Sequence, residues 1–124
     1  MAINGLTKSF QAEGTINPFR IVKVGAADYG ALQAAAVSDK FLGISTEVDT
    51  ASGERLDVVH ERIADLKLGG TVARGDFLTT DASGQGVTAA PAGGTNNQVI
   101  GRALTSGVNG DIIPVMVAPS TLQG

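Results

Sequence analysis

With 124 residues, a net charge of −3 and no cysteine, the chain is expected to form one small domain without disulfides or thiolate metal sites. Its nine basic residues are scattered, so direct binding to nucleic acid is not expected. The start of the chain has no basic region followed by an apolar segment, and no window is long enough to cross a bilayer. We therefore expect no membrane association and a protein made without a secretion signal.

The balance of residue types predicts a core of small side chains. Hydrophobic residues make up 43% of the chain but aromatic residues only 4%. The core must therefore consist of many aliphatic side chains, and the chain length allows for one such core rather than two. Because 17 glycines raise the entropy lost on folding, association between copies would help to stabilise the fold.

The first 17 residues carry single apolar side chains separated by glycine and polar residues. This pattern is too sparse for a core strand and predicts an extended N-terminal arm over residues 1–17. A dense β-type run over residues 19–24 then predicts a strand. The arm could pack on its own domain, or it could contact a partner by adding a strand to a neighbouring sheet. The residues inferred to make such contacts are Ile3, Leu6, Phe10, Ile16 and Phe19.

The next segments continue the β pattern. Residues 32–36 suit either one helical turn or extended chain. Residues 41–45 predict a strand in which Gly43 marks a bulge or a close backbone approach. Residues 51–54 are expected to form a turn. From residue 56 to residue 68, apolar and polar side chains alternate, which predicts antiparallel strands with one face in water.

Turn signals divide the second half of the chain. Glycine-containing turns on both sides of residues 72–80 predict hairpin connections at both ends, and residues 89–97 are expected to form a surface loop. Residues 99–104 predict a strand that echoes residues 41–45, with a glycine in the middle of an apolar run, as a short internal duplication would produce. Pro114 removes a ladder donor from the last strand, so that strand, or its Pro114 end, is expected at a sheet edge.

These elements together predict an all-β fold, a small antiparallel β-barrel or sandwich with an extended N-terminal arm. Gly-Asp opens an apolar run twice, at residues 75–78 and 110–113, as expected of a chain that alternates turns and strands. The predicted organisation is the arm over residues 1–17, a single β-domain over 18–119 and a tail over 120–124.

Few residues suggest catalysis or cofactor binding. His60 is the only histidine, and because a zinc site needs three or four ligands we interpret it as a surface residue. Arg74-Gly75-Asp76 matches an adhesion tripeptide, but turn chemistry explains it as well as the second Gly-Asp pair, which no arginine precedes. We expect no catalytic residue, no metal and no cofactor.

Several of these turns and strands together resemble the capsid cement, or head decoration, proteins of tailed bacteriophages. The resemblance covers about residues 18–119. The stretches that carry it are residues 53–59, 63–64, 69–72, 74–79, 81–84, 99–104, 110–111 and 115–119.

The resemblance implies a structural virion protein without catalytic activity. Such a protein binds the outside of an icosahedral head after expansion and stabilises contacts between neighbouring subunits of the phage major capsid protein. It implies a homo-oligomer, with a trimer favoured over a dimer, on the outer surface of the capsid after synthesis in the bacterial host cytoplasm. The family has no catalytic motif to carry over, so the capsid contacts named above rest on the arm alone.

Two other classes of function remain open. A carbohydrate-binding or ligand-binding β-module would use the loop at residues 89–97, although that loop has no aromatic platform. A hydrolase that uses His60 with a serine and an aspartate would lose its activity, but not its fold, in a His60→Ala variant.

Overall fold

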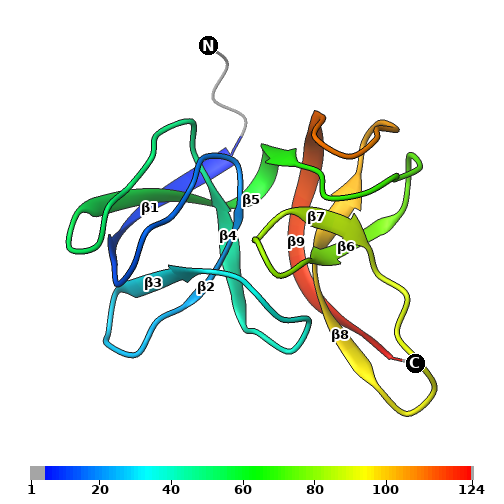
Figure 1. Cartoon of the computed structure of the whole chain (residues 1–124), viewed down its shortest axis with the longest axis horizontal. Helices are drawn as coiled ribbons and strands as arrows, with labels where there is room; N and C mark the ends of the chain where they lie inside the picture. Colours follow the sequence, from blue (N-terminus) through cyan, green and yellow to red (C-terminus); the bar gives the residue numbers. More distant parts are fainter. Residues whose placement is uncertain (1–4, 124) are drawn as a thin grey trace.

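The computed structural model describes residues 5–123, which form nine strands arranged in two lobes that lie side by side (Figure 1). This confirms the all-β prediction and selects a barrel over a sandwich. The strands are β1 Gly5–Ala12, β2 Ile21–Val24, β3 Gly30–Gln33, β4 Phe41–Ser45, β5 Arg55–Lys67, β6 Phe77–Thr80, β7 Gly86–Thr88, β8 Asn96–Ala103 and β9 Ile112–Gln123.

The first lobe is a closed barrel in which the strands follow the order β1, β3, β2, β4, β5, and β5 pairs back with β1. β1 consists of residues that the sequence assigned to the arm. In a barrel only every second side chain of a strand faces the core, and here Phe10 and Ala12 pack against it. The interpretation of this segment as too sparse for a core strand is therefore wrong for residues 5–12.

The second lobe repeats the strand order of the first. It contains the second half of β5 followed by β9, β8, β6 and β7. A parallel bridge between Leu68 and Gly86 brings β7 back beside the end of β5. β5 thus belongs to both lobes, and the change occurs at Arg62, which lies opposite β1 on one side and β9 on the other. Arg62 has a φ of 69°.

Two glycines occupy equivalent positions in the two lobes. Gly43 lies in β4, where an added Cβ would overlap the carbonyl oxygen of Val59 on β5. Gly101 lies in β8, where an added Cβ would overlap the carbonyl oxygen of Met116 on β9. Backbones therefore approach closely at the same point of each lobe, as predicted for Gly43. The sequence echo between these two runs is part of a structural duplication.

The Gly-Asp pairs mark one kind of turn that recurs in both lobes. Residues 51–54, 73–76 and 108–111 each have glycine in the third position, with φ of 89°, 92° and 91°. In each turn the carboxylate of the fourth residue accepts the backbone N–H of the first, at 2.8, 3.0 and 2.9 Å. Glycine adopts the positive φ of a type II turn without steric cost. The pattern that is most visible in the sequence is therefore structural.

The core consists of two clusters rather than the single core expected from chain length. The larger cluster fills the second lobe and continues across the junction through Ile21, Ala34 and Ile44 of the first lobe. Two clusters fit into this chain because five short strands enclose an interior that a few small side chains can fill. The smaller cluster fills the first barrel with Ala12, Ile16, Val22, Ala31, Leu56 and Val58.

The connections, residues 32–36 and the last strand refine the sequence prediction. Residues 81–84 join β6 and β7 as the predicted hairpin, whereas residues 68–71 lead from β5 to β6, which do not pair. Residues 32–36 contain no helical turn: residues 32 and 33 end β3, and residues 34–36 are not helical. β9 lies between β5 and β8 rather than at an edge. The Pro114 carbonyl accepts the N–H of Leu104, which lies just beyond the end of β8. The N–H that proline lacks would therefore point toward Leu104, where the β8–β9 ladder has already ended, so no ladder hydrogen bond is lost.

The close approach at Gly101 gives a test of the duplicated fold. Gly101→Ala is expected to destabilise the protein by about 1–3 kcal/mol, because the added methyl group must displace the β9 backbone. The measurement is the free energy of unfolding in urea. Gly93→Ala is the matched control, since no atom lies within 4 Å of its added Cβ, and should change stability by no more than about 0.5 kcal/mol. Equal effects of both substitutions would contradict the interpretation.

Candidate functional site

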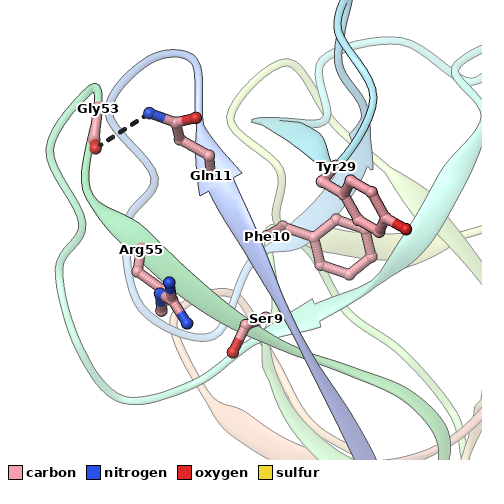
Figure 2. A pocket seen from close by; sticks show the side chains of 6 residues that line it. All are labelled: Ser9, Phe10, Gln11, Tyr29, Gly53 and Arg55. Atoms are coloured by element: carbon pink, nitrogen blue, oxygen red, sulfur yellow. Dashed lines mark hydrogen bonds between the residues drawn. The ribbon is translucent and has the colours of Figure 1, made fainter.

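An open groove of about 420 Å³ lies on the outside of the first lobe (Figure 2). It combines two aromatic rings with side chains that donate or accept hydrogen bonds. Its lining residues are Ser9, Phe10, Gln11, Tyr29, Gly53 and Arg55.

The pairing of β1 with β5 positions one side of the groove. Ser9 lies opposite Asp57 and Gln11 lies opposite Arg55. The Ser9 hydroxyl donates to the Asp57 carboxylate at 2.9 Å, and the Gln11 amide donates to the Gly53 carbonyl at 3.4 Å. Both β1 side chains face outward because strand side chains alternate between the two faces. This side of the groove is therefore set by strand register.

Tyr29 forms the other side of the groove, and its side chain is 68% exposed. A carboxylate holds the turn that carries it: Glu13 accepts the backbone N–H groups of Ala26 and Ala27 at 2.8 and 2.9 Å. These two hydrogen bonds lower the pKa of Glu13 below its usual value. The backbone N–H of Gln11 also donates to the Tyr29 carbonyl at 2.7 Å. An exposed tyrosine on an anchored turn is a preorganised contact residue.

Two basic side chains lie at the groove. The Lys8 ammonium is 5.6 Å from the centroid of the Tyr29 ring, within the range of a cation–π interaction. Arg55 lines the groove and is exposed. Within residues 5–123, neither cation lies within 4.0 Å of a carboxylate oxygen. The groove therefore offers aromatic surface and positive charge to a partner.

The five contact residues inferred from the sequence are not brought together. Ile3 lies outside the described residues, and Leu6 belongs to β1. Phe10 packs partly on the first core and lines the groove. Ile16 is completely buried, and Phe19 is half-buried in the turn before β2 with a φ of 57°. Of the described side chains, Phe10 is therefore the one that reaches the groove, and its contact with a capsid stays a prediction.

Tyr29 and Arg55 were not singled out from the sequence. Tyr29 is the only tyrosine of an aromatic-poor chain, which is a weak signal by itself. Arg55 belongs to a stretch that alternates like any half-buried strand. They share a groove because β1 lies between them: Gln11 donates its backbone N–H to the Tyr29 carbonyl and lies opposite Arg55 on β5. Both contacts join residues far apart in the sequence.

The other residues considered for chemistry are explained by the fold. His60 lies on β5, and its Nδ1 is 4.0 Å from a Glu61 carboxylate oxygen. The Asp76 carboxylate caps its own turn and accepts the Thr88 hydroxyl at 3.0 Å. Across residues 5–123, no three side chains of histidine, cysteine, aspartate or glutamate gather as metal ligands. Nor does this part of the chain contain a helix long and apolar enough to cross a membrane.

The protein thus combines a closed five-stranded barrel, a second lobe with the same strand order and an open groove of aromatic and hydrogen-bonding side chains. The chain matches the model of the phage cement protein family over residues 3–117 and belongs to that family. This confirms the resemblance seen in the sequence. Family membership implies association with the phage capsid and a place in the virion.

The fold is shared with a solved phage structure. The chain is similar to the N base of head fiber gp8.5 of bacteriophage phi29, with a TM-score of 0.66 and 18% sequence identity, covering 96% of this chain and 98% of that chain. A search of the curated proteins finds no match.

The Glu13 anchor predicts a pH-dependent contribution to stability. Because its pKa is lowered in the folded state, the stabilisation is fully present above the usual value of 4.5 and is lost as pH falls through the lowered folded value. Glu13→Gln should lower the thermal midpoint at neutral pH. The gap from the unmodified protein should then shrink as pH falls from about 7 to about 3. A gap that stays constant across that range would contradict the assignment.

Proposed function

We propose that this chain binds the outer surface of a phage capsid and stabilises contacts between neighbouring major capsid subunits. The observation that carries the proposal is the match to the phage cement protein family over residues 3–117. The phi29 protein of the same fold is the base of a head fiber, so this double barrel also occurs on the head of another phage. Such a protein acts after its synthesis in the host cytoplasm, without a cofactor.

The groove of the first lobe is the surface that we assign to the capsid. Tyrosine and arginine are the residue types that most often dominate binding energy at protein interfaces, and Tyr29 and Arg55 are both exposed here. Tyr29 sits on a turn that Glu13 anchors, so little conformational entropy is lost when it binds. Phe10 adds apolar surface at the base of the same groove.

Docking through the groove differs from strand addition by a free arm. β1 pairs with β5 along residues 5–11, and its other edge pairs with β3 at Gln11 and Ala12, so it is already part of the closed barrel. Lending it to a neighbour would open the barrel and expose Ala12 and Ile16, which are almost completely buried. We therefore assign the contact to side chains on the outside of a closed barrel.

Assembly of several copies makes modest contacts sufficient. We propose a homo-oligomer, with a trimer favoured over a dimer, in which each copy presents one groove to the capsid. Once one groove is bound, the others are held at a high effective concentration, so the avidity exceeds the affinity of a single groove. One oligomer would then connect several capsid subunits.

A second candidate function rests on the same groove. Two aromatic rings beside an amide, a hydroxyl and a guanidinium also suit a sugar, which stacks on aromatic faces and exchanges hydrogen bonds with polar groups. This carbohydrate-binding alternative would use the first lobe. The loop at residues 89–97, which the sequence suggested for it, does not line the groove.

Cosedimentation with expanded, undecorated capsids tests the capsid assignment. The unmodified protein should bind saturably. Tyr29→Ala combined with Arg55→Ala should weaken binding at least about tenfold, because each side chain is expected to contribute more than about 1 kcal/mol. Arg74→Ala removes an exposed arginine from a turn of the second lobe and is the matched control that should bind normally.

Each alternative outcome of that experiment has a clear meaning. Unchanged binding by the double variant would remove the groove from the capsid contact. No binding by the unmodified protein would overturn the capsid proposal. Binding to immobilised glycans that is lost in the double variant would then favour the carbohydrate-binding function.

A further inference from the structure

β9 carries a row of apolar side chains on the outside of the second lobe. Ile112 is 50% exposed and Met116 is 42% exposed, with the half-buried Pro114 between them. These residues alternate with Ile113, Val115 and Val117, which are buried in the core. The outward row is therefore a second apolar face on a strand whose other face already packs inside the protein.

Strand register extends this row across the sheet. Met116 lies opposite Ile63 on β5 and opposite Arg102 on β8, and Arg102 lies opposite Phe77 on β6. Residues directly opposite in neighbouring strands point to the same side of a sheet. Phe77 is 39% exposed, and the Arg102 guanidinium lies 4.4 Å from its ring centroid. We call this surface the β9 face, formed by Ile63, Asp65, Phe77, Arg102, Ile112, Pro114 and Met116.

The first lobe provides an internal control for the β9 face. Ile112 directly follows the turn at residues 108–111, and Arg55 directly follows the equivalent turn at residues 51–54. Because the lobes are duplicated, these two residues occupy equivalent positions. Two residues farther on, Pro114 lies opposite Asp65, whereas the equivalent Asp57 lies opposite Ser9. Two positions, those of Ile112 and Pro114, are thus polar in the first lobe and apolar in the second, whereas Met116 corresponds to the apolar Val59. The barrel itself does not require apolar side chains at the positions of Ile112 and Pro114.

We propose that the β9 face is the surface through which copies of this chain associate. This rests on the proposed function insofar as that function calls for an oligomer. Interfaces between identical subunits are more apolar than other protein surfaces, which fits the row of Ile112, Pro114 and Met116. In a trimer, three such faces would meet around the three-fold axis, and each would contact both neighbours.

The charges beside the row also fit a second copy. Asp65 is exposed on the β5 side of the face, and Arg102 is exposed on the β8 side. In a closed ring the β5 side of one copy meets the β8 side of the next. That arrangement places Asp65 of one copy near Arg102 of its neighbour, so opposite charges meet at each contact.

The two surfaces lie on different lobes, which allows both to be occupied at once. Figure 1 shows β1, which forms one side of the groove, in one lobe and β9 in the other. Copies joined through β9 would leave each groove free for the capsid. The inference therefore makes a prediction that can be tested without any capsid.

Analytical ultracentrifugation of the purified full chain at micromolar concentration tests the proposal. The unmodified protein should be a trimer, and Met116→Asp should weaken association about a hundredfold or more, because the interface would then bury a carboxylate in place of an apolar side chain. Val48→Asp is the matched control: Val48 is 61% exposed in the first lobe, and its replacement should leave the trimer intact. Thermal unfolding of both variants verifies that they fold.

Three outcomes would overturn the proposal. The first is an unmodified protein that is monomeric. The second is a Met116→Asp variant that remains as oligomeric as the control and still cosediments with capsids. The third is a Met116→Asp variant that keeps its oligomeric state but no longer cosediments with capsids, which would assign the face to the capsid. In that third case the proposed function itself would stand.

A charge exchange tests the ring arrangement independently. Asp65→Arg and Arg102→Glu should each weaken association at least about tenfold by placing like charges together. The double variant restores opposite charges across the contact and should associate more tightly than either single variant. A double variant that associates more weakly than both single variants would contradict the proposed pairing.

Discussion

The fold depends on one shared strand. The first half of β5 closes the first barrel against β1, and its second half pairs with β9 in the second lobe. Neither lobe can lose β5 without opening a barrel, and the larger core cluster crosses the junction between them. Two duplicated barrels therefore behave as one packed body, although each has its own small aliphatic core. The groove and the β9 face are held in a fixed relation by the same strand.

Duplication places equivalent residues in different roles. The carboxylate-capped turns and the two crossing glycines are common to both lobes, because the barrel geometry requires them at those points. Two of the outward positions differ between the lobes, so the fold does not fix their residue type. Arg55 and Asp57 are polar, whereas Ile112 and Pro114 are apolar. Comparison of the two lobes thus separates residues that the fold requires from residues that are available for contacts.

Much of the fold could be predicted from the sequence, because strands and turns depend on neighbouring residues. The strand at residues 41–45 and the Gly-Asp turns follow from local patterns. The role of β1 did not, because its sparse apolar residues become a core strand only through β5, more than forty positions away in the chain. The groove was missed for the same reason, since Tyr29 and Arg55 meet only after the barrel closes. Pro114 suggested that the last strand lies at a sheet edge. In the structure Pro114 lies beside the end of β8, and the point at which β8 ends cannot be read from the sequence.

Closure of the first barrel affects how many copies of the protein can be packed close together without associating through their strand edges. Each of its five strands has a neighbour on both sides, although β1 pairs with β3 only at Gln11 and Ala12, which leaves residues 5–10 without a ladder partner on that edge. Exposed strand edges are the usual templates for fibril growth. Copies packed densely on a shell would meet at high local concentration, where any free edge becomes a hazard. A closed barrel confines the free backbone of its lobe to this short edge and so limits polymerisation through its sheets in such an array.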